Sequence, residues 1–342
     1  MDGPVSDAHG RPVRRKLFTL LVLLPLAVLV WATQRSDPFT FDRRVVVTDL
    51  LPKVPAAERE QLGPFVLQQA WLLEGGDHRF GGYSALVPQE GGLLAISDRN
   101  RTLSIPVPLK PGVFTSPMPN MVVQRWPDGH TSIGFDTESV VRDPADGSLW
   151  TGLEDDVRVV RTGPRTGAAS LIPVNETRDW PRNGGAEAMA RLPDGRWIML
   201  CESCGTGRGG LHLGLMFKGR PGLSKAQKFG FLVPAGFDPV DAVPLPDGRL
   251  LILVRKLGLS PPGFSARIVL ADVSRLDPRR PLPTVELARL EGPVLHENWE
   301  GMALTAGKAG LSLWLVSDAN ASTFQQTRLL RLEFDPAHLP GR

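Results

Sequence analysis

The sequence predicts an all-β protein that folds as a β-propeller of five recognisable four-stranded repeats. Five look-alike segments recur along the chain, at Ser84, Glu138, Glu187, Asp241 and Glu300, with spacings of 54, 49, 54 and 59 residues. Periods of about 40 to 50 residues with several strands per unit are typical of propeller blades. The apolar runs in these segments are separated by Asp-Gly or Gly-Gly turns, which are the strongest short-range signal for a β-hairpin.

The N-terminal 32 residues are predicted to be a separate element. Arg14, Arg15 and Lys16 precede an apolar run from Leu17 to Ala32, which is the pattern of a signal peptide. One interpretation is cleavage after Ala32. The other is an uncleaved membrane anchor, although the run is shorter than the ~20 residues of a typical span. Residues 33–64 are expected to form a linker or extension, and residues 65–342 the propeller domain.

Each repeat is expected to begin with an inner strand that carries the recurrent residue. Inner strands are predicted at 82–88, 137–142, 185–191, 239–245 and 299–305, and second strands at 93–98, 148–153, 196–201, 249–254 and 311–317. Third strands are predicted at 157–162, 211–217, 265–273 and 327–334, and outer strands at 121–125, 169–174, 228–233 and 284–290.

The last repeat lacks an outer strand of its own. The apolar run from Phe65 to Leu73 is expected to supply it, because a strand shared between the two ends of the chain closes the ring and removes free sheet edges. Five blades result. The alternative is a sixth blade that includes the run from Val45 to Leu51.

The recurrent acidic residues Glu138, Glu187, Asp241 and Glu300 are expected to converge at one mouth of the central channel, since equivalent positions of all blades face the axis. Several carboxylates at such short range cannot all be ionised without a counter-charge. A hard cation such as Ca²⁺, which takes six to eight oxygen ligands, is one solution, and a shared proton or interleaved Arg and Lys side chains are two others. The alternative is that each acid recurs because it accepts a backbone N–H bond from the neighbouring blade.

Charge and composition exclude a nucleic-acid-binding role. Removal of residues 1–32, which contain four basic and two acidic residues, would lower the formal net charge from +3 to +1. The chain has a single tyrosine and no basic stripe with interleaved aromatic residues, so the features of a nucleic-acid interface are missing.

The only two cysteines, Cys201 and Cys204, lie three residues apart at the end of a second strand. In an oxidising compartment this spacing favours a small loop disulfide. A thioredoxin-like redox pair would need a βαβ context, and a zinc site would need two further ligands at suitable spacing; the sequence offers neither.

Several motifs, taken in order, resemble the phytase-like family, described as having esterase-like activity of phytase and found in exported bacterial proteins. They are GGYSAL, DTESVV, GAEAMARLPDGR, DAVPLPDGRLLILVRK and NWEGMAL, within residues 75–334. The resemblance implies a propeller whose acidic residues carry phosphoesterase chemistry, located in the bacterial periplasm or on the extracellular face of the inner membrane. The fourth repeat departs from the family pattern, with Asp241 where Glu is more frequent and Arg255-Lys256 where a Glu-Arg pair is usual.

The charges suggest a metal-assisted hydrolysis of a phosphoric or carboxylic ester. Glu138, Glu187 and Glu300, with Asp241, are the expected catalytic acids. Glu138, Glu187, Glu300 and Asp318 are the expected ligands of Ca²⁺ or a similar cation, which would lower the pKa of a bound water. The expected contacts of a small anionic or ester substrate are Arg99, Arg255 and Lys256.

Two other functions remain compatible with the sequence. One is a non-catalytic propeller of the cell envelope that binds a ligand or a partner protein, because a fold does not determine a function. The other is a metal-dependent lactonase that uses the same carboxylates. Contact with a membrane is expected only through the N-terminal segment, if it is uncleaved.

Overall fold

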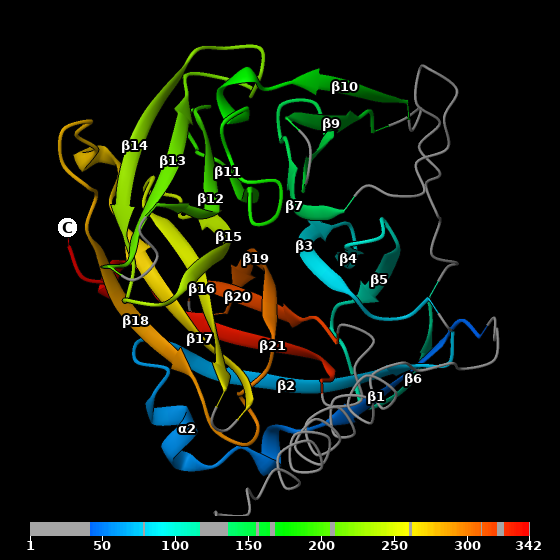
Figure 1. Cartoon of the computed structure of the whole chain (residues 1–342). Coiled ribbons are helices and arrows are strands. Elements are labelled where there is room, and N and C mark those ends of the chain that lie inside the picture. Colours follow the sequence, from blue (N-terminus) through cyan, green and yellow to red (C-terminus); the bar gives the residue numbers. More distant parts are fainter. Residues whose placement is uncertain are drawn as a thin grey trace, which may run out of the picture.

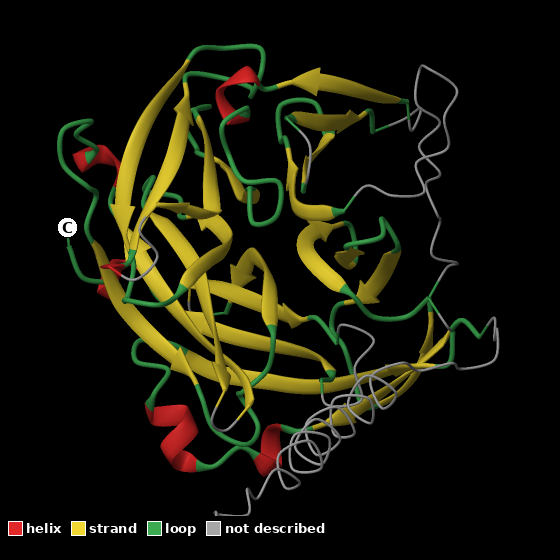
Figure 2. Cartoon of the chain, in the orientation of Figure 1, coloured by secondary structure: helices red, strands yellow, loops and turns green. Residues whose placement is uncertain are grey.

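The computed structural model describes residues 42–341 except 78, 117–135, 155–156, 165–167, 206–208, 260–261, 309 and 320–324. The predicted leader at 1–32 and the expected outer strand at 121–125 lie outside the described residues. Five β-sheets are arranged in a ring (Figure 1), with a central pocket lined by residues of their inner strands. The helices among the described residues are short and peripheral (Figure 2). Within the described part of the chain, no helix combines the length and the hydrophobicity that crossing a membrane requires.

The sheets follow one another along the chain as blades. Blade 1 contains β3 (Tyr83–Gln89), β4 (Gly92–Ser97) and β5 (Thr102–Pro106). Blade 2 contains β7 (Thr137–Arg142), β8 (Leu149–Leu153), β9 (Arg158–Thr162) and β10 (Ala169–Pro173). Blade 3 contains β11 (Ala186–Arg191), β12 (Trp197–Gly205), β13 (Leu211–Phe217) and β14 (Ala226–Leu232). Blade 4 contains β15 (Asp238–Pro244), β16 (Leu250–Leu259), β17 (Pro262–Ala271) and β18 (Thr284–Leu290).

Blade 5 joins the two ends of the chain. Its strands, in spatial order, are β19 (Trp299–Gly307), β20 (Gly310–Ser317), β21 (Thr327–Phe334), β2 (Val66–Gly75), β1 (Arg44–Asp49) and β6 (Gly112–Thr115). The predicted closure is confirmed, because β2 pairs antiparallel with β21 from Val66 opposite Glu333 to Leu73 opposite Thr327. The sixth blade is not formed, because β1 pairs with β2 and β6 and so widens blade 5.

The short helices lie in the connections outside the ring. The one α-helix among the described residues, α2 (Ala56–Glu60), follows a 3₁₀ turn, η1 (Leu51–Lys53), before β2. The other 3₁₀ turns of the described chain are η2 (Asn175–Thr177), η4 (Val273–Arg275) and η5 (Pro336–His338). None of them contributes to the wall of the channel, which is built from inner strands.

The Asp-Gly turns connect inner to second strands as predicted. In blade 4 the Asp247 carboxylate accepts the backbone N–H of Arg249 at 3.1 Å, and Gly248 between them has φ +87°. Asp194 and Asp146 accept equivalent bonds in blades 3 and 2. A side chain that mimics a backbone turn and a glycine at positive φ are the two requirements of so tight a reversal.

Large aromatic side chains fill the space between blades. Trp150, Trp197 and Trp314 lie in second strands and are each at most 1% exposed. The rings of Trp150 in blade 2 and Trp197 in blade 3 lie 5.4 Å apart. Burial of apolar side chains between sheets supplies most of the stabilisation of such a fold.

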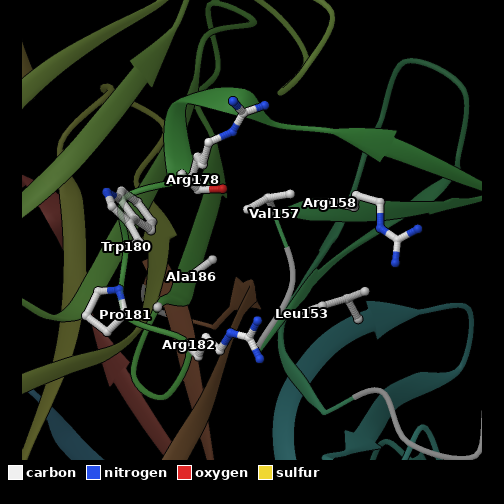
Figure 3. A pocket seen from close by; sticks show the side chains of 10 residues that line it. Leu153, Val157, Arg158, Arg178, Trp180, Pro181, Arg182 and Ala186 are labelled. Atoms are coloured by element: carbon white, nitrogen blue, oxygen red, sulfur yellow. The ribbon is translucent and has the colours of Figure 1, made fainter.

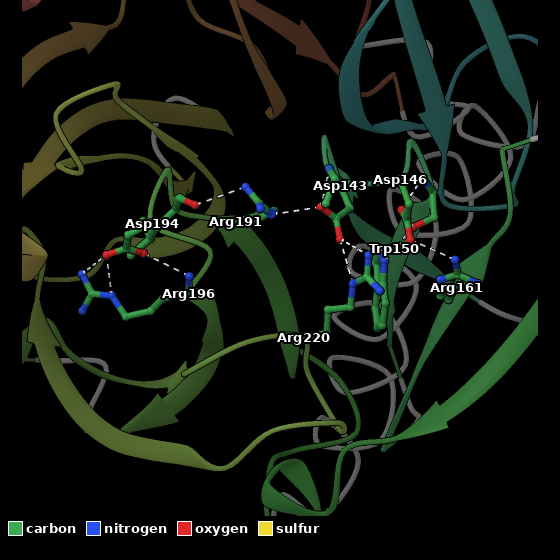
Figure 4. A network of polar contacts seen from close by, with 11 residues as sticks. Asp143, Asp146, Trp150, Arg161, Arg191, Asp194, Arg196 and Arg220 are labelled. Carbon is green, nitrogen blue, oxygen red and sulfur yellow. Dashed lines mark hydrogen bonds and ion pairs between the residues drawn. The ribbon is translucent and has the colours of Figure 1, made fainter.

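An ion-pair network joins blades 2 and 3 at the ends of their inner strands (Figure 4). Asp143, which is 1% exposed, forms an ion pair with Arg191 Nε at 2.9 Å and accepts a hydrogen bond from Arg220 Nε at 2.8 Å. Arg220 also pairs with Asp146 at 2.6 Å. Both arginines belong to blade 3 and both aspartates to blade 2, so this group, the Asp143 clamp, ties the blades together.

Candidate functional site

Every inner strand carries a β-bulge at the same place, near its start. A bulge inserts one unpaired residue and re-aims its side chain. The unpaired residues, which we call the bulge ring, are Ser84, Glu138, Glu187, Val240 and Glu300. The inner strands β3, β7, β11, β15 and β19 each pack beside the next, and β19 packs beside β3, so the bulge ring surrounds one end of the channel.

Asp241 is not the fourth member of this ring, in contrast to the alignment expected from the sequence. The bulge in β15 falls on Val240, which packs in an apolar cluster with Trp299. Asp241, one residue further on, accepts the backbone N–H of Ala242 at 2.7 Å and that of Met302, in blade 5, at 2.5 Å. Burial raises the pKa of Asp241 to about 8. The alternative interpretation, an acid that bonds the neighbouring blade, therefore describes Asp241.

A second ring comes from the ends of the second strands. In four blades, the backbone N–H of a residue near the end of the second strand donates to a backbone carbonyl of the inner-strand side, two positions before the bulged residue. The Glu154 N–H donates to the Asp136 carbonyl at 2.9 Å, and the Asp318 N–H donates to the Asn298 carbonyl at 2.8 Å. The equivalent residue of blade 4 is Arg255, opposite Asp238. The second-strand ring is therefore Asp98, Glu154, Glu202, Arg255 and Asp318.

The carboxylates of the two rings interact strongly. Burial, together with the negative charges of Glu187, Glu300, Asp136 and Glu154, raises the pKa of Glu138 far above its ordinary value. Burial and the charge of Glu202 likewise raise the pKa of Glu187, which is 4% exposed and hydrogen-bonded to Glu138. The raised pKa values mean that these neighbouring carboxyl groups hold their protons to a higher pH than an isolated glutamate does.

Arg255 is the cation within the rings. Its Nη1 donates to Asn298 Oδ1 at 2.8 Å and to Glu300, and its Nη2 lies 3.5 Å from Glu202 Oε1. Burial alone would lower the pKa of Arg255, but the charges of Glu300, Glu202 and Glu187 raise it on balance. Blade 4 thus contributes a partly buried positive charge at the place where other blades contribute an acid.

One group of acids has the geometry of a cation site. Single carboxylate oxygens of Asp136, Glu138 and Glu154 all lie within 4.8 Å of one another. Burial, followed by the charges of Asp98 and Glu154, raises the pKa of Asp136 to about 6. Clustered carboxylates whose proton affinity is raised are the hard oxygen donors that Ca²⁺ and Mg²⁺ prefer, so the donor set fits such an ion.

The remaining predicted site residues lie around this group. Asp318 is buried in the second-strand ring beside Asn298, and Asn298 donates to Glu300 at 2.7 Å. Arg99 and Lys256 each follow a ring position by one residue. Arg99 is exposed beside Asp98, with 3.8 Å between Arg99 Nε and Asp98 Oδ2, and Lys256 packs on the ring of Phe237. Arg99 thus pairs with Asp98 of the second-strand ring, whereas Arg255 contacts Glu300 and Glu202.

Sequence reasoning did not single out Asp136, Glu154 and Glu202. The sequence contains a sign of these positions, because the apolar run of the second strand ends near a charged residue in most repeats. Which of the residues near that end enters the ring depends on the strand register. Glu202 lies inside a loop closed by a disulfide between Cys201 and Cys204, with Cα atoms 5.4 Å apart. A side chain at Gly184, with φ +76°, would collide with Ser203 and Glu202, so the glycine lets this loop approach closely.

The comparisons with known proteins give a family and several likenesses of structure. A model of the phytase-like family, described as "esterase-like activity of phytase", matches residues 78–321. No curated protein sequence matches the chain significantly.

Solved structures resemble the chain at low identity. Aldose sugar dehydrogenase of Streptomyces coelicolor in its PQQ-bound form is 14% identical, with TM-score 0.41, over 77% of this chain and 97% of that one. Regucalcin, a calcium-binding protein of Agrobacterium tumefaciens, is 11% identical, with TM-score 0.43, over 89% and 95%. The catalytic domain of the GH62 α-L-arabinofuranosidase of Coprinopsis cinerea is 10% identical, with TM-score 0.45, over 75% and 93%.

Proposed function

Because the chain belongs to the phytase-like family, whose model spans most of the propeller, we propose that it hydrolyses an ester bond, phosphoric or carboxylic, at the two rings with the help of a divalent cation such as Ca²⁺. The observation that carries this proposal is the convergence of Asp136, Glu138 and Glu154 within 4.8 Å. Three like charges at this range need either protons or a cation, and they offer three of the six to eight oxygen ligands that Ca²⁺ takes.

The side chains of the rings can perform acid–base chemistry. The raised pKa values of Glu138 and Glu187 favour the protonated form of these carboxyls, and Glu138 lies close to the carboxyls of Asp136 and Glu154. The protonated member of the pair can donate to a leaving oxygen, and an ionised neighbour can accept a proton from water, as in other sites where environment separates the roles of two carboxyls. Arg255 holds Glu300 and Glu202 in place. A bound cation would supply charge neutralisation of the developing oxyanion and a lowered pKa of water.

The proposal is tested by cation binding and by turnover. The melting temperature of the full-length chain should rise on addition of Ca²⁺ after chelation, and hydrolysis of phosphate esters, carboxylic esters or lactones should need the cation. Glu138→Gln should abolish both effects. Glu90→Gln, at an exposed turn between β3 and β4, is the matched control and should retain them.

Two outcomes would contradict the proposal. No cation-dependent shift in the unmodified chain would exclude the metal site. A shift without turnover of any ester or lactone, unaffected by Glu138→Gln, would favour a ligand-binding propeller, in which the acids serve the architecture as Asp241 does.

We also propose that the protein works in the cell envelope, in the periplasm or on the outer face of the inner membrane. The disulfide between Cys201 and Cys204 supports this location, since such bonds persist in oxidising compartments. Fractionation of cells that express the full-length chain, with detection by antibody, tests it; recovery with the reduced cytosolic proteins would overturn it.

A further inference from the structure

A pocket of about 480 Å³ lies beside the rings, between blade 2 and the start of blade 3 (Figure 3). Three arginines line it: Arg158 at the start of β9, and Arg178 and Arg182 in the segment that leads into β11. The half-buried Trp180, between the last two, adds a flat apolar wall. The pocket therefore combines three positive charges with one aromatic surface.

The pocket and the rings share their walls. Leu153 and Ala186, which line the pocket, directly precede Glu154 and Glu187 of the rings. The Gly184 N–H, from the same connecting segment, donates to Glu154 Oε1 at 3.0 Å. A molecule in the pocket therefore lies one residue along the chain from the positions that carry Glu154 and Glu187.

Arg178 and Arg182 differ from the other arginines described above. Arg220 and Arg255 are held by carboxylates. Arg178 and Arg182 are exposed, Arg178 Nη2 donates to the Asn175 amide oxygen at 3.2 Å, and neither has a carboxylate partner within the described ranges of the chain. A guanidinium presents a rigid fork of donors that matches phosphate, sulfate and carboxylate groups.

We infer that this arginine pocket binds an oxyanionic group of the substrate, next to the ester bond that the rings hydrolyse. The inference rests on the proposed function. It also explains how an anionic substrate could bind at this site, because the acidic rings repel an anion and the arginine pocket attracts one. The substrate class is thus an ester with a second, non-reacting phosphate, sulfate or carboxylate close to the reacting bond.

Binding of inorganic phosphate to the full-length chain, after chelation and dialysis, is the first arm of the test and needs no turnover. Titration calorimetry should show phosphate binding, and the double variant Arg178→Gln/Arg182→Gln should weaken it at least tenfold. Arg279→Gln, at an exposed turn of blade 4, is the matched control and should leave the affinity unchanged. Equal affinity in the double variant, or no binding to the unmodified chain, would overturn the inference.

The second arm compares two esters that differ only in a remote charge, phenyl acetate and 4-acetoxybenzoate. The same comparison is made with a pair of phosphodiesters that differ in the same way, by a carboxylate on the phenyl group. The double variant should raise KM for the anionic member about tenfold and leave the neutral or less charged member unchanged. An equal change for both members would overturn the substrate role. If no ester is hydrolysed while phosphate binding depends on the two arginines, the proposed function fails and the anion site stands.

Discussion

Arg255 decides the charge balance at the scale of single residues. It occupies the position at which blades 1, 2, 3 and 5 place Asp98, Glu154, Glu202 and Asp318, and it faces Glu300 and Glu202. The departure of the fourth repeat from the family pattern therefore does not only remove an acid. It brings a cation into the interior of an otherwise acidic ring, while Val240 fills the other position of that blade with an apolar side chain.

Arg255→Gln should lower the free energy of unfolding at pH 7.5 by about 3–5 kcal/mol, because removal of one partner leaves buried charges uncompensated. At pH 5 the loss should be smaller, since the acids can then take up protons. Urea unfolding at both pH values measures it. Lys256→Gln, at the exposed neighbouring position, should change stability by less than about 0.5 kcal/mol. Equal effects of the two variants would contradict the role of Arg255.

The sequence allowed part of this site to be predicted. Glu138, Glu187 and Glu300 recur in aligned segments, and equivalent positions of a propeller must converge. The prediction that Asp241 belongs to the bulge ring was wrong because the β-bulge of β15 falls one residue earlier, on Val240. An apolar residue at that position cannot be recognised from the sequence as the equivalent of the acids in other blades. Asp136 and Glu154 enter the site through strand pairing, which a single sequence does not specify.

At the scale of elements, short constraints fix the loops and blades around the site. The disulfide of Cys201 and Cys204 closes the loop that carries Glu202, and β12 departs from regular pairing with β13 between Leu200 and Gly205. The disulfide therefore constrains the loop where hydrogen bonds between β12 and β13 are missing, and it keeps Glu202 directed toward Arg255.

The double variant Cys201→Ser/Cys204→Ser should lose about 2 kcal/mol of stability, the chain-entropy value for so short a loop. Cation affinity should fall as well, because Glu202 would no longer be fixed. Urea unfolding and Ca²⁺ titration of the variant measure the two effects. Reductant should reproduce them in the unmodified chain and leave the variant unaffected; the opposite pattern would exclude a role for the bond.

The Asp143 clamp acts between blades. Asp143→Asn should destabilise the fold by about 3 kcal/mol, because two arginines of blade 3 lose a buried partner. Asp194→Asn removes the more exposed pair with Arg196 in the same region (Figure 4), and should cost less than about 1 kcal/mol. Thermal or urea unfolding of both variants compares them, and similar losses would show that the clamp adds nothing beyond a surface ion pair.

At the scale of the whole molecule, the fold concentrates acids with raised pKa values around its axis. Asp136 titrates at about 6 and Asp241 at about 8, and the pKa values of Glu138, Glu187 and Glu202 are raised as well. An acid whose folded pKa exceeds its unfolded value stabilises the fold at low pH, and this contribution disappears as the pH rises through the folded pKa.

The cation-free protein should therefore lose stability between about pH 4 and pH 8, by several kcal/mol at about 1.4 kcal/mol per pKa unit. Ca²⁺ should flatten this profile, because it replaces the protons as counter-charge at the ring acids. Urea unfolding at pH 5, 6.5 and 8, with and without Ca²⁺, measures the slope. Stability that increases with pH in the absence of cation would contradict the placement of these acids.

The overall architecture could be predicted because hairpin turns and a repeat period are local signals, and closure by the segment before the first blade followed from the missing outer strand. The role of β1 could not, since a strand of six residues outside any repeat can pair in several ways.

Closure through blade 5 also imposes an order in time. Strand β2 ends at Gly75 and its partner β21 begins at Thr327, so synthesis of the intervening chain takes roughly 10 to 50 s at 5–20 residues per second. During that interval β2 has an unpaired edge, and the ring is completed only by the last strand to be made. A chain that stopped just after Asp318 would contain every residue of both rings and still could not close the circle that holds them together.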